Sequence, residues 1–200
     1  MDVAGEPGRW AVVKKKNLLV VAASPRPRGN STTLAGEAAR GAADAGAEVR
    51  VVRLADLAFG PCRACDWCRK PGAKGCVQAD DMKALQADIR KADGLLIASP
   101  VYWFTMSAQA KLFMDRLYVF GAKSYRELKG KRIGVILASG DADPRASGAL
   151  NAMRAFQDAF AYLGAPIVGM VHHGGGRAGA ARKNEAVMKE ACALGRALAS

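Results

Sequence analysis

Apolar segments rich in aliphatic and β-branched residues alternate along this chain with segments whose polar and apolar residues are spaced as in helices. The five apolar segments are residues 17–23, 48–54, 94–98, 132–138 and 166–171. The helix-compatible segments are residues 31–44, 81–91, 107–119, 148–163 and 181–199. Strands that are apolar at every position are buried on both faces, which is typical of parallel sheets covered by helices on both sides. The pattern therefore predicts a doubly wound α/β fold with a five-stranded parallel sheet.

The order of the strands predicts where a ligand would bind. In a doubly wound sheet with the order 2-1-3-4-5, the topological switch point lies between the first and third strands. Ligands of such folds bind outside the carboxyl ends of the strands at that point. The loops after Ala23 and after Ala98 are therefore the first places to look for function.

The loop after the first strand is rich in hydroxyl and basic side chains and leads directly into a helix. Its candidate binding residues are Ser24, Arg26, Asn30, Ser31 and Thr32. Backbone N–H groups and the helix dipole make such a helix start a site for an anion. The loop lacks the glycine pattern of dinucleotide-binding folds and the Gly-Lys-Ser/Thr of triphosphate loops. It is similar to the loop with which flavodoxins bind the phosphate of FMN; the alternative is an ordinary polar turn.

Two further loops supply candidates for binding a planar ring. After the third strand come a proline, a valine and three aromatic residues, and a short polar turn follows the fourth strand. The candidates are Pro100, Val101, Tyr102, Trp103, Ser139 and Gly140. Proline fixes a turn, and its neighbours can present backbone amides and an aromatic face to a ring. The alternatives are core or subunit-interface packing for the aromatic residues and a plain glycine turn at residue 140.

Composition and charge narrow the classes of function. The 200 residues fit one domain, which we expect over residues 16–200 after a flexible extension at residues 1–15. That extension lacks the apolar core of a secretion signal, and no apolar run is long enough to span a membrane, so we expect a cytoplasmic protein without a membrane partner. The net charge is +12, but the basic residues are scattered, which argues against nucleic acid as a partner. The charge favours an acidic electron-carrier protein or a phosphate-bearing cofactor.

Taken together, these loops resemble the NADPH-dependent FMN reductase family of flavodoxin-like oxidoreductases. The resemblance rests on Ser24-Pro25-Arg26 with Gly29-Asn30-Ser31-Thr32, on Ser99-Pro100-Val101-Tyr102-Trp103, and on the helix that follows, and it covers residues 16–200. It implies that the first loop binds the phosphate of FMN, that residues 100–103 bind the flavin ring, and that Ser139 and Gly140 lie on the opposite side.

The resemblance also implies an activity and an assembly. Members of the family take a hydride from NAD(P)H and reduce quinones, free flavins, azo or nitro compounds, or electron carriers, usually as homodimers or homotetramers. The flavin carries the chemistry, so we expect no catalytic acid or base in the protein. His172 and His173, which we expect just beyond the fifth strand, receive no role.

Four cysteines lie close together in an insert at residues 56–80. They are Cys62, Cys65, Cys68 and Cys76. The spacing begins like that of a bacterial ferredoxin, but the last interval is longer and Val77 replaces the usual proline. It resembles the motif of the iron–sulfur flavoproteins, a branch of the same fold that carries a four-iron four-sulfur cluster beside FMN. A cluster, no metal at all, and a tetrathiolate zinc site all remain open.

The sequence thus predicts an FMN-dependent oxidoreductase that uses NAD(P)H. The first alternative is an iron–sulfur flavoprotein that transfers electrons between ferredoxin-like carriers and FMN. A non-enzymatic electron carrier and a nucleic-acid-binding protein of the same fold rank below the reductase.

Overall fold

The computed structural model describes residues 15–200, so the predicted extension at residues 1–15 lies almost wholly outside the described residues. Five parallel strands form the main sheet in the order β2-β1-β3-β5-β6. They are β1 (Asn17–Ala22), β2 (Glu48–Arg53), β3 (Gly94–Tyr102), β5 (Arg132–Ser139) and β6 (Ile167–Gly174). This is the predicted order of five strands. The two-residue strand β4 (Thr105–Met106), which pairs antiparallel with β3, is additional.

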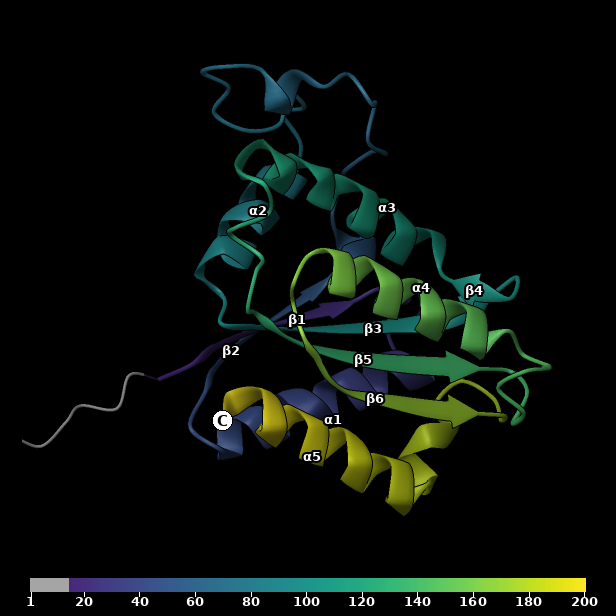
Figure 1. Ribbon diagram of the computed structural model, residues 1–200. Coiled ribbons are helices and arrows are strands. Elements are labelled where there is room, and N and C mark those ends of the chain that lie inside the picture. Colours follow the sequence, from purple (N-terminus) through teal and green to yellow (C-terminus); the bar gives the residue numbers. More distant parts are fainter. Residues whose placement is uncertain (1–14) are drawn as a thin grey trace, which may run out of the picture.

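Helices cover both faces of the sheet, as predicted (Figure 1). They are α1 (Asn30–Asp44), α2 (Met82–Lys91), α3 (Ala108–Arg116), α4 (Ala149–Tyr162) and α5 (Glu185–Ala199). Helices α1 and α5 lie on one face, and α2, α3 and α4 lie on the other. Short 3-10 helices η1 to η4 cover Leu54–Asp56, Trp67–Arg69, Leu117–Lys123 and Ala180–Lys183. Across residues 15–200, we find no helix with the length and hydrophobicity that crossing a membrane requires.

Alternate side chains of each central strand enter two separate cores. In β1, Leu19 and Val21 pack under α2, α3 and α4, whereas Leu18 and Val20 pack against α1 and α5. This follows from the two-residue period of a strand, which points successive side chains to opposite faces. Burying each such aliphatic side chain stabilises the fold by about 1.5–3 kcal/mol. The continuous apolar runs in the sequence therefore mark the centre of the sheet.

Strand β2 departs from that rule. It is the edge strand beside β1, and most of it is partly or fully exposed, with Val51 at 51%. Its valines resemble those of a buried strand, but one edge is unpaired, and Val49 and Val52, which face opposite cores, are only partly buried. The prediction of burial on both faces was therefore wrong for Glu48–Arg53, whereas Leu54, which follows the strand, is buried.

Two strands are longer than predicted. Strand β3 continues to Tyr102; it stays paired with β5 as far as Pro100, and its last two residues pair with β4. The carbonyl of Ala98 accepts a hydrogen bond from Ala23 N, so the nitrogen of Pro100, two residues on, points to the same side, where β1 has already ended. A missing N–H is tolerated at that position. Strand β6 continues to Gly174, so His172 and His173 lie inside the strand and not beyond it.

Two predicted helices differ from the observed ones at their ends. Helix α5 begins at Glu185, where the side chain of Asn184 accepts a hydrogen bond from Val187 N, four residues later than expected. Residues 180–183 form the 3-10 helix η4 instead. Helix α3 ends at Arg116, and the chain continues as η3.

Gly41 on α1 and Gly195 on α5 allow these two helices to cross with their backbones in contact. A Cβ atom at Gly195 would overlap the carbonyl oxygen of Ala38, and one at Gly41 would overlap the carbonyl of Cys192. This close contact fixes the position of α1 on the sheet. The first residues of α1, Asn30 and Ser31, lie at the carboxyl ends of the strands.

Candidate functional site

A cavity of about 270 Å³ lies at the carboxyl ends of β1, β3 and β5, and we call it the strand-end cavity. All three loops singled out in the sequence contribute to it. The predicted residues that line it are Ser24, Arg26, Asn30, Ser31, Pro100, Val101, Tyr102, Ser139 and Gly140. The fold thus brings together residues from three distant parts of the chain, at the switch point expected of a doubly wound sheet.

One end of the strand-end cavity has the features of an anion site. The hydroxyl of Ser31 has no hydrogen-bond partner within residues 15–200, although the residue is only 1% exposed. Gly29 precedes the helix and has no side chain, so the first N–H groups of α1 stay open to a ligand. A Cβ at Gly29 would lie 2.8 Å from the hydroxyl of Ser24, which accepts a hydrogen bond from Arg26 N at 3.1 Å. An unpaired buried hydroxyl at an open helix start suits a phosphate group.

Two residues predicted to bind the phosphate, Asn30 and Thr32, instead form hydrogen bonds with the protein backbone. The amide of Asn30 donates to the carbonyl of Arg177 and accepts from Ala181 N, both at 3.2 Å. Asn30 therefore ties the start of α1 to the loop after β6. The hydroxyl of Thr32 donates to the carbonyl of Arg26 at 3.2 Å, and Thr32 does not line the cavity.

Gly176 and Ala178 line the strand-end cavity and were missed from the sequence, as was Ala138. For the first two, the sequence holds one local signal, the run of three glycines at 174–176. No local pattern sets Ala138 apart from the rest of its strand.

Trp103 and Phe104 form the turn between β3 and β4, outside the strand-end cavity. Trp103 is 92% exposed and Phe104 is 55% exposed, and both have positive φ angles of 47° and 63°. Such angles are uncommon for large residues. The amide of Asn151 on α4 holds the turn by donating to the carbonyl of Phe104 at 3.2 Å. The two aromatic residues line an open hollow of about 580 Å³, which shares Val101, Tyr102 and Gly140 with the cavity.

Ser139, on the wall of the strand-end cavity, is held by His172 of the neighbouring strand. Its hydroxyl lies 2.7 Å from His172 Nε2 and 2.8 Å from the carbonyl oxygen of Asp141. A carbonyl can only accept, so the hydroxyl donates to Asp141 and His172 Nε2 donates to the hydroxyl. Burial, and then the charge of His173, lower the pKa of His172; burial also lowers the pKa of His173. The neutral forms are therefore favoured, and His172 acts as a fixed donor.

The four clustered cysteines line a second, much smaller cavity of about 20 Å³. They belong to the loop at residues 56–80, which we call the cysteine loop and which lies beyond α2 and α3, away from the carboxyl ends of the strands (Figure 1). Each of the four is a free thiol. Burial raises the pKa of Cys68, and the neighbouring thiols of Cys76, Cys62 and Cys65 raise it further. The fold therefore brings the four cysteines to one cavity.

The backbone of the cysteine loop is bent between its first three cysteines. Ala64 and Asp66 have positive φ angles of 49° and 52°. Turns of this kind direct successive N–H groups to one side, as in many anion and iron–sulfur sites. The hydroxyl of Tyr118 holds one turn by donating to Asp66 Oδ1 at 2.8 Å. In the described part of the chain, no three His, Cys, Asp or Glu side chains are arranged around one metal ion.

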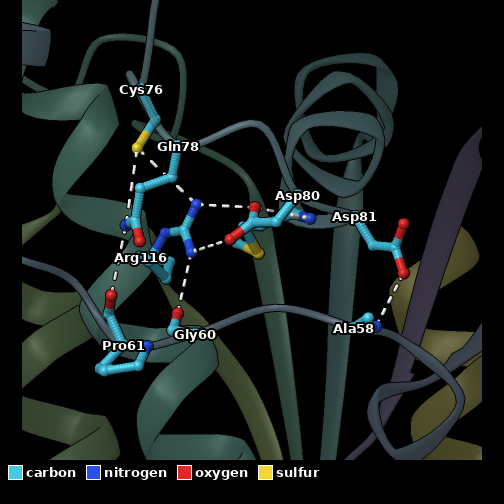
Figure 2. Close-up of polar contacts among 9 residues, drawn as sticks. Ala58, Gly60, Pro61, Cys76, Gln78, Asp80, Asp81 and Arg116 are labelled. Carbon is cyan, nitrogen blue, oxygen red and sulfur yellow. Dashed lines mark hydrogen bonds and ion pairs between the residues drawn. The ribbon is translucent and has the colours of Figure 1, made fainter.

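A buried ion pair beside the cysteine loop was not foreseen from the sequence. Arg116 and Asp80 are 36 positions apart and are joined by two hydrogen bonds, of 2.6 and 2.9 Å (Figure 2). The guanidinium of Arg116 holds the pKa of Asp80 below its usual value, and Asp80 raises the pKa of Arg116. Both side chains are therefore charged. No local sequence pattern indicates such a pair.

Comparisons with known proteins agree with this geometry. The profile of the family described as NADPH-dependent FMN reductase matches residues 17–196. An iron–sulfur flavoprotein of Methanosarcina thermophila is 32% identical over 156 residues, which are 78% of each chain. Another, from Methanocaldococcus jannaschii, is 40% identical over 96 residues; they cover 48% of this chain, which spans about half, 49%, of that relative.

A solved structure extends the likeness of the fold to most of the chain. The NAD(P)H:quinone oxidoreductase from Methanothermobacter marburgensis superposes with a TM-score of 0.71 at 18% identity. The match covers 92% of this chain and 98% of that one. At this identity the match supports the flavodoxin-like fold alone. The family profile and the iron–sulfur flavoprotein relatives assign this chain to the NADPH-dependent FMN reductase family, in its iron–sulfur flavoprotein branch, and the strand-end cavity and the four cysteines at one cavity agree with that assignment.

Proposed function

We propose that this flavin oxidoreductase transfers electrons between FMN in the strand-end cavity and a four-iron four-sulfur cluster held by the cysteine loop. The observation that carries the proposal is the gathering of four free thiols at one small cavity. Four thiolates are the ligand set of such a cluster. The iron–sulfur flavoproteins among the relatives support it.

The residues of the strand-end cavity fit FMN. Ser31, Ser24, Arg26 and the open start of α1 would hold the phosphate, and residues 100–102 with Ser139 and Gly140 would hold the ring. FMN, when bound, supplies the redox chemistry. The protein binds and orients it, and the hydrogen bond from His172 keeps Ser139 fixed at the wall of the cavity. We assign no acid or base to the chain.

The cysteine loop fits a cluster by its donors, although the cavity between them is small. At about 20 Å³ it has room for roughly one water molecule. Cys62, Cys65, Cys68 and Cys76 would each supply one thiolate, and the segment that carries the first three would move outward to make room for the cluster. A cluster supplies one-electron transfer. Thiols that must stay reduced agree with the predicted cytoplasmic location, and the charge of +12 favours an acidic electron carrier as partner.

Hydride transfer from NAD(P)H is a second candidate for the source of electrons. The open hollow beside Trp103 and Phe104 favours it, because it adjoins the strand-end cavity and is large enough for a planar ring. A nicotinamide or a small quinone, azo or nitro acceptor would enter there.

The test is a spectrum of protein purified and reconstituted without oxygen. We expect flavin bands together with a broad absorbance near 400 nm, and about four irons and four sulfides per chain. Addition of NADPH or NADH then separates the two electron sources, since bleaching of the flavin supports the hydride donor and an unchanged spectrum excludes it. Protein with FMN but without iron or sulfide would overturn the cluster and leave the flavin assignment standing.

The exposed turn at Trp103 and Phe104 leads us to expect a homodimer or homotetramer. Exposed aromatic side chains held in a strained turn indicate a contact surface. Light scattering at micromolar concentration should give at least twice the chain mass of 21.0 kDa. Replacing both residues with serine should shift the protein toward monomer, whereas Tyr162→Ser, which removes another exposed aromatic residue on α4, should not. A monomeric parent would contradict the expectation.

A further inference from the structure

Of the four clustered cysteines, Cys76 is the one whose position is least determined by its spacing from the others in the sequence. The first three cysteines follow one another at intervals of three residues, whereas Cys76 comes eight residues after Cys68. Its position depends on contacts with other segments. Two side chains donate to its sulfur: Arg116 Nη2 at 3.7 Å and Gln78 Nε2 at 4.0 Å (Figure 2).

Arg116 is itself held rigidly. It is the last residue of α3, where a cation interacts favourably with the helix dipole, and its side chain is 1% exposed. Nη1 donates to the carbonyl of Gly60 at 2.8 Å and to Asp80 Oδ2 at 2.6 Å. Nη2 donates to Asp80 Oδ1 at 2.9 Å and to the sulfur of Cys76. Each of the four hydrogens on these nitrogens therefore has an acceptor.

These contacts join the two ends of the cysteine loop. Gly60 precedes Cys62 by two residues and Asp80 follows Cys76 by four. One guanidinium therefore binds both ends of the loop. Three more hydrogen bonds connect the same ends: Gln78 Nε2 donates to the carbonyl of Pro61 at 3.2 Å, Ala58 N donates to Asp81 Oδ2 at 2.7 Å, and Asp81 N donates to the carbonyl of Ala58 at 3.3 Å. The sulfur of Cys76 is thereby set against a fixed, charged donor.

We propose that Arg116 is a positioning residue for the iron–sulfur site, which holds the sulfur of Cys76 in place and raises the reduction potential of the cluster by donating to it. The inference rests on the cluster proposed above. Hydrogen bonds to ligand sulfur are among the factors that set the potential of a cluster, because reduction adds negative charge that a donor stabilises. If Arg116 served only to pair with Asp80, the last of its four Nη hydrogens would not need to point at the sulfur of Cys76.

The test compares variants that keep the net charge of the site. The double variant Arg116→Gln/Asp80→Asn removes one positive and one negative charge, so a change in potential cannot come from net charge. Its shorter amide no longer reaches Cys76. Arg116→Lys is the second variant. An ammonium group can pair with Asp80, but it cannot form the bidentate pair with that carboxylate and at the same time donate to the sulfur of Cys76. The matched control is Arg154→Gln/Asp158→Asn, an exposed pair on α4 at 2.8 Å.

Each reconstituted protein is titrated with reductant, and the reduced cluster is followed by electron paramagnetic resonance. We expect both Arg116 variants to bind iron and to need a lower potential, with the reduced-to-oxidised ratio falling about tenfold at a given potential, or about 59 mV for one electron. The α4 control should match the parent. FMN affinity, which depends on residues far from the loop, serves as the check on folding.

A second measurement needs no cluster. In the iron-free proteins, hydrogen exchange of residues 58–62 and 76–81 should be faster in the Arg116 variants than in the parent and the α4 control. Variants that bind iron with an unchanged potential would overturn the inference. A parent protein that takes up no iron would overturn the cluster itself, so the two failures are distinguishable.

Discussion

Cys65→Ser protein should lose its iron and keep its FMN. Cys65 is the exposed member of the four thiols, and the cavity that it lines is shared by the other three. A serine hydroxyl is a poor ligand for a four-iron four-sulfur cluster, so the iron content of anaerobically reconstituted protein should fall from about four per chain toward zero. The residues that would hold the flavin phosphate belong to other segments. The affinity for FMN should therefore stay at the parent value.

The chain offers a matched control for this experiment in its fifth cysteine. Cys192 is buried on α5, where its sulfur lies 3.6 Å from Arg40 Nη2, far along the chain from the cysteine loop. Cys192→Ser removes one thiol without touching the loop and should retain full iron and sulfide. Iron analysis and the absorbance near 400 nm measure both proteins. Equal iron in the Cys65→Ser variant and the parent would show that this thiol is not a ligand.

The double variant Arg26→Ala/Ser31→Ala should bind FMN about a hundredfold more weakly than the parent. A hydrogen bond to a charged group contributes about 1.5–3 kcal/mol, and 1.4 kcal/mol is a factor of ten in Kd. The hydroxyl of Ser31 is buried and unpaired among the described residues, so a phosphate is the partner it lacks. Arg26 is exposed, which keeps the expected loss at the lower end of the range. Fluorescence quenching of free FMN measures the affinity.

Arg28→Ala is the control, because Arg28 is an exposed cation in the same loop that does not line the strand-end cavity. Its effect on Kd should stay within about twofold, as for an ordinary surface substitution. If the double variant binds FMN as tightly as the parent, the phosphate lies elsewhere. If Arg28→Ala weakens binding as much as the double variant does, general charge attraction is responsible and not the cradle at Ser31.

The strand order and the place of the cavity were predictable because both follow from local patterns. Runs such as Leu18 to Val21 mark a central strand, since only a strand with helices on both sides can bury every side chain. The expected strand order placed the topological switch point between the first and third strands, and this indicated which loops would form the cavity. The same reasoning failed for β2, whose valines read as buried although the strand lies at the edge of the sheet.

Features that depend on pairs of distant residues were not predictable. His172 was expected in a loop, yet β6 continues past it because β5 pairs with it in register through Ser139. The ion pair of Arg116 and Asp80 joins α3 to the second residue before α2 across 36 positions. Neither residue differs in its local sequence from an ordinary charged residue at a helix end. From one sequence alone, two such residues cannot be distinguished from two charged residues that do not interact.

Helix α3 connects the two sites at a fixed spacing. Ser107, the residue before its first turn, donates to the carbonyl of Ala23 and accepts from Ala110 N, so this end is bound to the residue that precedes Ser24 of the strand-end cavity. Arg116 at the other end is fastened to the cysteine loop. Nine residues at 1.5 Å each make a spacer about 13 Å long. Inserting one residue into α3 would swing Arg116 about 100° around the helix axis and away from Cys76. The length of α3, counted in whole residues, thus sets the distance and the relative orientation of the strand-end cavity and the cysteine loop.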